Sequence, residues 1–448
     1  MTNVNFLHVT AEQLPLAAKA IPGTAAHSGE DVRPRSAVSA GTGLAGSIAL
    51  AILLLAAYRF SLGGLQATFL LLAGTALSMA LWSVAVERVH RRSSTGLDFS
   101  LERSASGLSH IVAVKTMGFA ATLALLGLCY FTFRNYAQPS FGIYLWSIVA
   151  AFPALLVASP FYIALTSRYM VEPKDGLWHF GMLVLLRFEE LDWDKIADHL
   201  RSWAIKGFFL AFMFSIMPGS VAAMLKLDVQ TILTDPLQTI LFLVRLAFLF
   251  DVVFGTIGYI VTTRLLDSHI RSANPYAAGW AAALICYPPF VIMGNGGPLD
   301  YRHGGLEWLD WLRGHDTLLI LWGLMIAALA VVYAWATVIF GLRFSNLTNR
   351  GIITNGPYRF FKHPAYIAKN LMWWCIHLPF LTTLGAEDAV RNTLLLVIVN
   401  VIYYMRAKTE ERHLMADPDY QAYSAWIARH GVLERLRRQL RVGLRHRA

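Results

Sequence analysis

Long apolar runs, separated by short polar and charged segments, follow one another along almost the whole chain. A helix needs about 20 residues to cross the roughly 30 Å hydrocarbon layer of a bilayer, and several runs reach that length. Apolar positions within a run are continuous rather than alternating, which is typical of helices and not of barrel strands. Since only helices and closed barrels satisfy their backbone in lipid, the expected fold is an all-α, polytopic membrane bundle.

Window hydropathy predicts about ten membrane spans. In chain order, the expected spans are 44–58, 67–86, 111–133, 143–165, 203–225, 239–261, 276–293, 317–340, 370–384 and 394–405. Pro288-Pro289 interrupts the seventh of them, and the last two are short. We expect these three segments to be buried within the protein or tilted, rather than to face lipid along their whole length.

Composition and charge narrow the class of protein that the sequence encodes. Of the 448 residues, 56% are hydrophobic and only 15% are charged, whereas about a quarter are charged in soluble proteins. The formal net charge of +10 would suit a nucleic-acid partner, but the basic residues stand in segments beside the apolar runs. We interpret these segments as cytoplasmic loops and expect no nucleic-acid partner. With about ten spans, both termini are also expected in the cytoplasm.

The chain is expected to contain two membrane regions between two tails. Residues 1–42 include a stretch rich in Ala, Ser, Gly and Pro, which predicts a disordered cytoplasmic tail. A multi-span region at 43–310 precedes a smaller membrane core at 311–430, and residues 431–448 form a basic cytoplasmic tail. The three cysteines lie in or beside apolar runs without metal-ligand spacing, so no metal site is predicted.

A polar island interrupts this hydrophobic pattern near the C-terminal end. His363-Pro364 predicts a helix start, because proline is favoured at the first helical position. The free backbone N–H groups there form a site that suits an anion. One face of this expected helix carries His363, Tyr366, Asn370, Trp373 or Trp374, and His377.

The last expected span carries a second polar face. Asn400, Tyr403, Tyr404 and Glu411 fall at helical spacing, and Glu410 lies about a hundred degrees round the helix. Since a short turn joins the last two spans, we expect an antiparallel hairpin that brings His363, the loop 356–359 and Glu410-Glu411 together at the cytoplasmic face. Such a pocket would suit a zwitterion, although an ordinary hairpin with interfacial Tyr, Arg and Glu anchors has the same pattern.

These motifs resemble one enzyme family. The chain contains Gly356-Pro357-Tyr358-Arg359, then Lys362-His363-Pro364-x-Tyr366, then Glu410-Glu411-x-x-Leu414 and Tyr420-x-x-Tyr423. Over residues 317–427 it is similar to the isoprenylcysteine carboxyl methyltransferase and phospholipid methyltransferase family. The resemblance implies an S-adenosylmethionine cofactor between the histidine-proline loop and the paired glutamates. By the same resemblance the cofactor contacts are His363, Pro364, Tyr366, Glu410 and Glu411, with Gly356, Pro357 and Tyr358 shaping the loop around the adenosine.

The implied activity is methyl transfer to a lipophilic substrate that enters from the bilayer. An isoprenoid or isoprenylcysteine carboxylate would need a cation for orientation, and Arg359 or Arg350 is the candidate. A lipid amine would need a base, which Glu410, His363 or His377 could supply. The expected substrate side of the pocket comprises Asn370, Trp373, Trp374, His377 and Tyr404, with membrane lipids as the surroundings. The sequence departs from the family pattern at Lys362, Ala368 and Asn370, which leaves the acceptor open.

Two other functions compete with this one. A sterol-type membrane reductase has a similar C-terminal hairpin but uses NADPH, whose phosphates would require additional basic residues near Glu410-Glu411. A transporter or lipid-binding scaffold with a vestigial methyltransferase module is the other alternative. Arg245 and Asp251 favour it slightly, since charged residues inside a span mark either a functional site or a structural pair with a neighbouring helix.

Overall fold

Helices dominate the computed structural model, which describes residues 32–101, 103–133, 146–432 and 434–435. Within these residues, seven helices are long and apolar enough to cross a membrane. They are α1 (Ala40–Arg59), α2 (Gly64–Ala85), α3 (Ala105–Phe133), α7 (Trp193–Leu225), α9 (Pro236–Ile260), α12 (Asp316–Val338) and α14 (Ala386–Leu414). The expected all-α membrane fold is confirmed, whereas the expected number of about ten spans is not.

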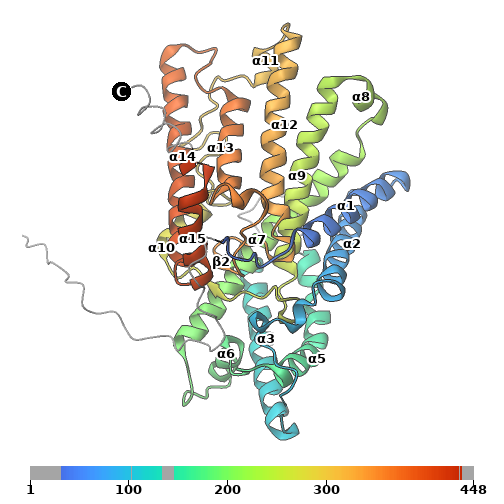
Figure 1. Ribbon diagram of the computed structural model, residues 1–448, viewed down its shortest axis with the longest axis vertical. Helices are drawn as coiled ribbons and strands as arrows, with labels where there is room; N and C mark the ends of the chain where they lie inside the picture. The colour runs from blue at the N-terminus through green and yellow to red at the C-terminus, as the bar shows by residue number, and fades with distance from the viewer. Residues whose placement is uncertain (1–31, 102, 134–145, 433, 436–448) are drawn as a thin grey trace, which may run out of the picture. The chain divides into compact units, whose positions relative to one another are not determined.

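Shorter elements connect and flank these helices (Figure 1). The remaining α-helices are α5 (Phe152–Tyr169), α6 (Gly176–Val184), α8 (Val229–Thr234), α10 (Ala277–Leu284), α11 (Trp308–Trp311), α13 (Pro364–His377) and α15 (Pro418–His430). Single 3-10 turns are η1 (Val89–Arg91), η2 (Ser93–Thr95), η3 (Arg264–Leu266), η4 (Gly341–Arg343) and η5 (Gly356–Arg359). Two short antiparallel strands, β1 (Ser272–Ala273) and β2 (Thr348–Asn349), pair Ser272 with Asn349.

The segments expected to be short or broken depart most from the predicted spans. Residues 276–293 form no span: α10 ends at Leu284, because Pro288 and Pro289 lack the N–H groups that a continuing helix needs. Helix α13 has 14 residues, or roughly 21 Å at 1.5 Å per residue, which is too short to cross a bilayer. The expected span 394–405 is the middle of the longer α14. Part of the expected span 143–165 lies outside the described residues, and α5 covers its second half.

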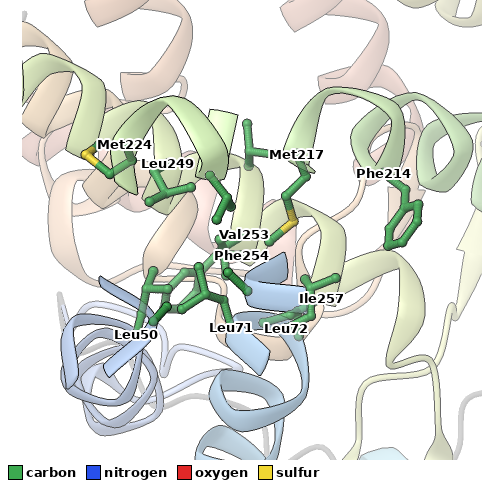
Figure 2. Packing of buried hydrophobic residues seen from close by; sticks show 14 of the residues in the cluster. Leu50, Leu71, Leu72, Phe214, Met217, Met224, Leu249, Val253, Phe254 and Ile257 are labelled. Atoms are coloured by element: carbon green, nitrogen blue, oxygen red, sulfur yellow. The ribbon is translucent and has the colours of Figure 1, made fainter. Parts of the chain in front are cut away.

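Four of the long helices share one apolar core. Leu50 of α1, Leu71 of α2, Met217 of α7 and Phe254 of α9 are buried against one another, as Figure 2 shows. Gly46 of α1 allows this close packing, because a Cβ there would lie 2.8 Å from Met79 Cγ and 2.9 Å from the Phe254 ring. Small residues at helix contacts let backbones approach in the same way throughout membrane proteins.

The C-terminal helices lie against this core through α9. Helix α9 packs along α12, α12 along α13, and α13 against α14 (Figure 1). Helix α1 begins at Ala40, close to the expected end of the N-terminal tail. The expected tails themselves fall mainly on residues 1–31 and 436–448, outside the described residues. The cytoplasmic placement of both termini stays a prediction.

One buried arginine ties the ends of α9 and α12 together. Arg350 is 3% exposed, and among the described residues its guanidinium donates hydrogen bonds to backbone carbonyls only. Two of these carbonyls, Gly258 O at 2.6 Å and Val261 O at 2.8 Å, belong to the C-terminal end of α9. The others are Ser268, Leu342 and Phe344. Next to it, Arg343 Nη2 lies 2.6 Å from Asp267 Oδ2 in a buried ion pair.

We expect Arg350→Lys to lower the free energy of unfolding by about 3 kcal/mol or more, because an ammonium group cannot reach all these carbonyls and each buried unpaired group costs about 1–3 kcal/mol. Denaturant titration of the purified protein in detergent measures this change. The exposed Arg91 provides the matched control, and Arg91→Lys should stay within about 0.5 kcal/mol of the parent protein. Equal stability of the two variants would contradict the role assigned to Arg350.

Candidate active site

Helix α13 begins where the sequence predicts it. His363 is the N-cap, Pro364 occupies the first helical position, and Ile367 N donates to His363 O at 3.2 Å. Proline is favourable there because its missing N–H has no partner inside a helix in any case. The preceding residues form η5, whose Gly356 has a positive φ of 55° that glycine adopts without strain.

Helices α13 and α14 form the expected antiparallel hairpin. Trp374 Nε1 donates to Asn400 Oδ1 at 2.8 Å, and Asn400 Nδ2 donates to Asn370 Oδ1 at 2.8 Å. Tyr366, near the start of α13, meets Glu410 near the end of α14, whereas Trp374, later in α13, meets Asn400, earlier in α14, so the two helices run antiparallel. Asn370, Trp374 and Asn400 therefore hold the two helices together.

His363 lies between the two glutamates at this meeting point. Its Nε2 is 3.2 Å from Glu411 Oε1, and its Nδ1 is 3.8 Å from Glu410 Oε2. Tyr366 OH donates to Glu410, and the rings of His363 and Tyr366 stack with centroids 5.6 Å apart. Lys408 Nζ approaches Glu411 Oε2 to 3.1 Å. Glu410 follows Pro364 by 46 residues in the chain. The paired glutamates and the histidine-proline motif nevertheless form one polar cluster.

Arg406 belongs to this cluster although sequence analysis did not identify it. Its side chain is 2% exposed, Nη2 donates to Asn346 Oδ1 at 2.7 Å, and Nε lies 3.7 Å from Glu410 Oε1. The guanidinium lies 5.2 Å from the Tyr366 ring centroid and 5.7 Å from that of Tyr403. Its position directly after the expected span 394–405 and four residues before Glu410 was the available signal.

A pocket opens beside the cluster. Its cavity volume is about 170 Å³, below the roughly 300–1,000 Å³ of typical small-molecule sites. Its walls come from α12, the segment 343–353, α13, α14 and α15, together with Tyr287. Three buried polar atoms of lining residues have no hydrogen-bond partner among the described residues: Thr348 Oγ1, Arg406 Nε and Tyr420 OH. Unpaired buried polar atoms are costly, so this wall suits a polar ligand.

Tyrosines hold the loop 356–359 at the edge of the pocket. Tyr423 OH donates to Tyr358 O at 2.7 Å, and Tyr358 OH donates to Ala336 O at 3.3 Å. Burial raises the pKa of the Tyr358 phenol well above its usual value, so this hydroxyl stays protonated and can donate. Tyr358 and Tyr423 both line the pocket.

The residues expected to bind the cofactor mostly gather at the pocket. Tyr358, His363, Tyr366 and Glu410 line it, and Glu411 contacts His363. Three others lie behind or outside the wall: Pro364 and Pro357 are buried, and Gly356 packs near Ile339.

The other expected residues lie away from the pocket. Arg359 is exposed and lies over the Phe360 ring, with its guanidinium 4.9 Å from the ring centroid. Tyr404 is 60% exposed on the far side of α14. His377 ends α13, where its Nδ1 is 3.9 Å from Glu307 Oε1. None of the expected substrate residues Asn370, Trp373, Trp374, His377 and Tyr404 lines the pocket; the neighbouring Lys369 and Tyr403 do.

Comparison with known families confirms the resemblance seen in the sequence. Residues 318–416 match the model of the isoprenylcysteine carboxyl methyltransferase (ICMT) family. The match contains almost all of α12 and the whole of η5, α13 and α14, and so includes His363, Glu410 and Glu411. Comparisons with curated proteins and with solved structures give no match. The C-terminal quarter of the chain thus matches a methyltransferase family, and the described residues contain seven helices able to cross a membrane.

Replacing Asn400 with alanine tests the pairing of the hairpin. Loss of its hydrogen bonds to Asn370 and Trp374 should lower the free energy of unfolding by about 1–3 kcal/mol. The neighbouring Val401, which is 52% exposed, supplies the control, and Val401→Ala should change stability by less than about 0.5 kcal/mol. Denaturant titration of both variants measures the difference; an Asn400→Ala protein as stable as its control would mean that the helices pair differently.

Proposed function

We propose that this protein is an integral-membrane, S-adenosylmethionine-dependent methyltransferase that acts on a lipophilic acceptor. The observation that carries the proposal is the cluster of His363, Glu410 and Glu411, formed within the segment that matches a methyltransferase family. The donor site is proposed to lie at the cytoplasmic face, where the expected topology places the start of α13.

The residues at the pocket fit such a methyl donor. S-Adenosylmethionine supplies an electrophilic methyl group on a sulfonium, and it also carries an ammonium, a carboxylate and a purine. Glu410 and Glu411 provide carboxylates for a cationic group, and the rings of Tyr358 and Tyr366 provide faces for a sulfonium or purine. Tyr420 OH and Thr348 Oγ1 provide unpaired polar atoms. The positively charged groups and the carboxylate of the ligand would therefore each find a partner in the pocket.

The pocket is less suited to a nicotinamide cofactor, although it is lined by several basic residues. Arg350 is occupied by backbone carbonyls, and Arg343 by Asp267 and Arg350 O. Lys362 Nζ donates to Ser424 Oγ at 2.8 Å and lies 3.7 Å from Glu411. At these three positions a phosphate would have to displace the existing partners, so the reductase alternative is not favoured.

The proposed acceptor is a lipid-soluble molecule with a carboxylate or an amine. Phe340, Phe344 and Leu347 give the pocket an apolar wall that suits a hydrocarbon chain. Most of the rate acceleration would come from holding donor and acceptor at attack distance. A carboxylate reacts without losing a proton. For an amine, Glu410 or His363 is near enough to accept the proton, whereas His377, at the other end of α13, is not.

Glu411→Ala should abolish donor binding or weaken it at least about 30-fold, since it removes a carboxylate and leaves His363 Nε2 without this partner. Isothermal titration of the purified protein with S-adenosylmethionine measures the affinity. Glu387 provides a control with the same charge on the same helix, because it is exposed in the first turn of α14. Equal affinities of Glu411→Ala and Glu387→Ala would refute the donor site.

His363→Ala should lower methyl transfer to membrane lipids by about 100-fold or more, because both glutamates lose the contact that they share. Transfer of a labelled methyl group into lipid extracts of membranes with and without the protein measures the activity and isolates the acceptor. His377→Ala, on the same helix, should retain activity. Unchanged transfer in His363→Ala would remove this residue from the site.

A further inference from the structure

A buried carboxylate from outside the family match reaches the pocket wall. Asp251 lies in α9 and is 7% exposed. Its Oδ2 accepts a hydrogen bond from Tyr333 OH at 2.8 Å, and its Oδ1 accepts one from Thr337 Oγ1 at 2.5 Å. Both donors belong to α12, and both line the pocket. Among the described residues, no basic nitrogen lies within ion-pair distance of Asp251, so these hydroxyls are its direct partners.

The ring of Tyr333 in turn faces a lysine inside the pocket. Lys369 Nζ lies 5.6 Å from the Tyr333 ring centroid, 5.2 Å from that of Trp373 and 5.7 Å from that of Tyr403. Lys369 lines the pocket, and among the described residues its ammonium has no carboxylate within ion-pair distance. Rings attract a cation through their faces, but they leave its three N–H donors unused.

We propose that Asp251 is a positioning residue for the acceptor end of the pocket: it fixes Tyr333, and through the ring of Tyr333 it holds Lys369 ready for an anionic group of the acceptor. This inference rests on the proposed function for the identity of the ligands. Lys369 lies six residues beyond His363 on α13, or roughly 9 Å along the helix axis. The acidic cluster and Lys369 therefore line the same pocket at points separated along α13.

The charges explain why Asp251 suits this task. A lysine in an apolar pocket is stabilised by a nearby negative charge, and Asp251 supplies one from behind the Tyr333 ring. Because the hydroxyl of Tyr333 is hydrogen-bonded to the carboxylate, the ring is held at its position beside the ammonium. Asp251→Asn keeps the size of the side chain but removes its charge. Tyr333→Phe keeps the ring but removes its hydrogen bond to Asp251.

Lysine resonances test the coupling without any need for activity. Reductive methylation with carbon-13 formaldehyde labels the lysine amines of the full-length protein in detergent, and Lys369→Met identifies the Lys369 signal by its loss. Because three aromatic rings lie near Lys369, its chemical shift should differ from those of the exposed lysines. We expect Asp251→Asn and Tyr333→Phe to move it in the same direction. Thr256→Val provides the control, since Thr256 is buried in α9 and bonds only within that helix. An unmoved signal in Asp251→Asn overturns the proposal.

Ligand titrations of the same samples decide which ligand meets Lys369. N-Acetyl-S-farnesylcysteine, a lipophilic carboxylate, should shift the Lys369 signal without a methyl donor, and Asp251→Asn should weaken its binding about tenfold. S-Adenosylmethionine should bind both proteins with affinities within about twofold. In Lys369→Met, the further change Asp251→Asn should have no added effect on acceptor binding, as a double-mutant cycle requires of coupled residues.

Each result has a separate meaning. A Lys369 signal that responds to S-adenosylmethionine and not to the farnesyl carboxylate overturns the acceptor assignment, as does additivity of the two substitutions. A parent protein that transfers no methyl group, but whose Lys369 signal moves in Asp251→Asn, refutes the proposed function and leaves the coupling of Asp251 to Lys369 established.

Discussion

The guanidinium of Arg350 is the contact on which the pocket depends. It gathers backbone carbonyls from the end of α9, the segment after it and the turn that follows α12. The carbonyls at a helix C-terminus have no partner within the helix and carry a partial negative charge, so they suit a buried cation. Arg350 thereby fixes the segment 343–353, and this segment forms one wall of the pocket.

Two other arginines at the pocket also have partners within the protein. Arg343 is neutralised by Asp267, and Arg406 is surrounded by Glu410, Asn346 and tyrosine rings. These cations organise the wall and already have partners within the protein. Glu410, Glu411 and His363 remain at one end as a cluster that can meet a cationic ligand. The polar wall and the apolar residues beside it suit a reaction between a charged donor and a lipid-soluble acceptor.

The region before the family match takes part in building this site. Helix α9 supplies the carbonyls that Arg350 binds and the carboxylate that Tyr333 binds. Tyr287, from the segment after α10, lines the pocket, and its ring lies 5.5 Å from the Arg406 guanidinium. Residues 318–416 alone would lack these contacts. The pocket therefore depends on residues outside the family match.

Local chemistry determined the membrane class, the helix start at Pro364 and the meeting of His363 with Glu410 and Glu411. Hydropathy, proline geometry and a short hairpin turn act between residues close in the chain. The expected span 276–293, which does not form, shows the limit of such predictions from local sequence. Hydropathy counts apolar residues without regard to the prolines that stop a helix. Only the tertiary structure decided which polar side chains face the pocket. Arg406, Lys369 and Asp251 lie at or behind its wall, while Arg359, His377 and Tyr404 lie elsewhere, because a side chain's surroundings depend on helices distant in sequence.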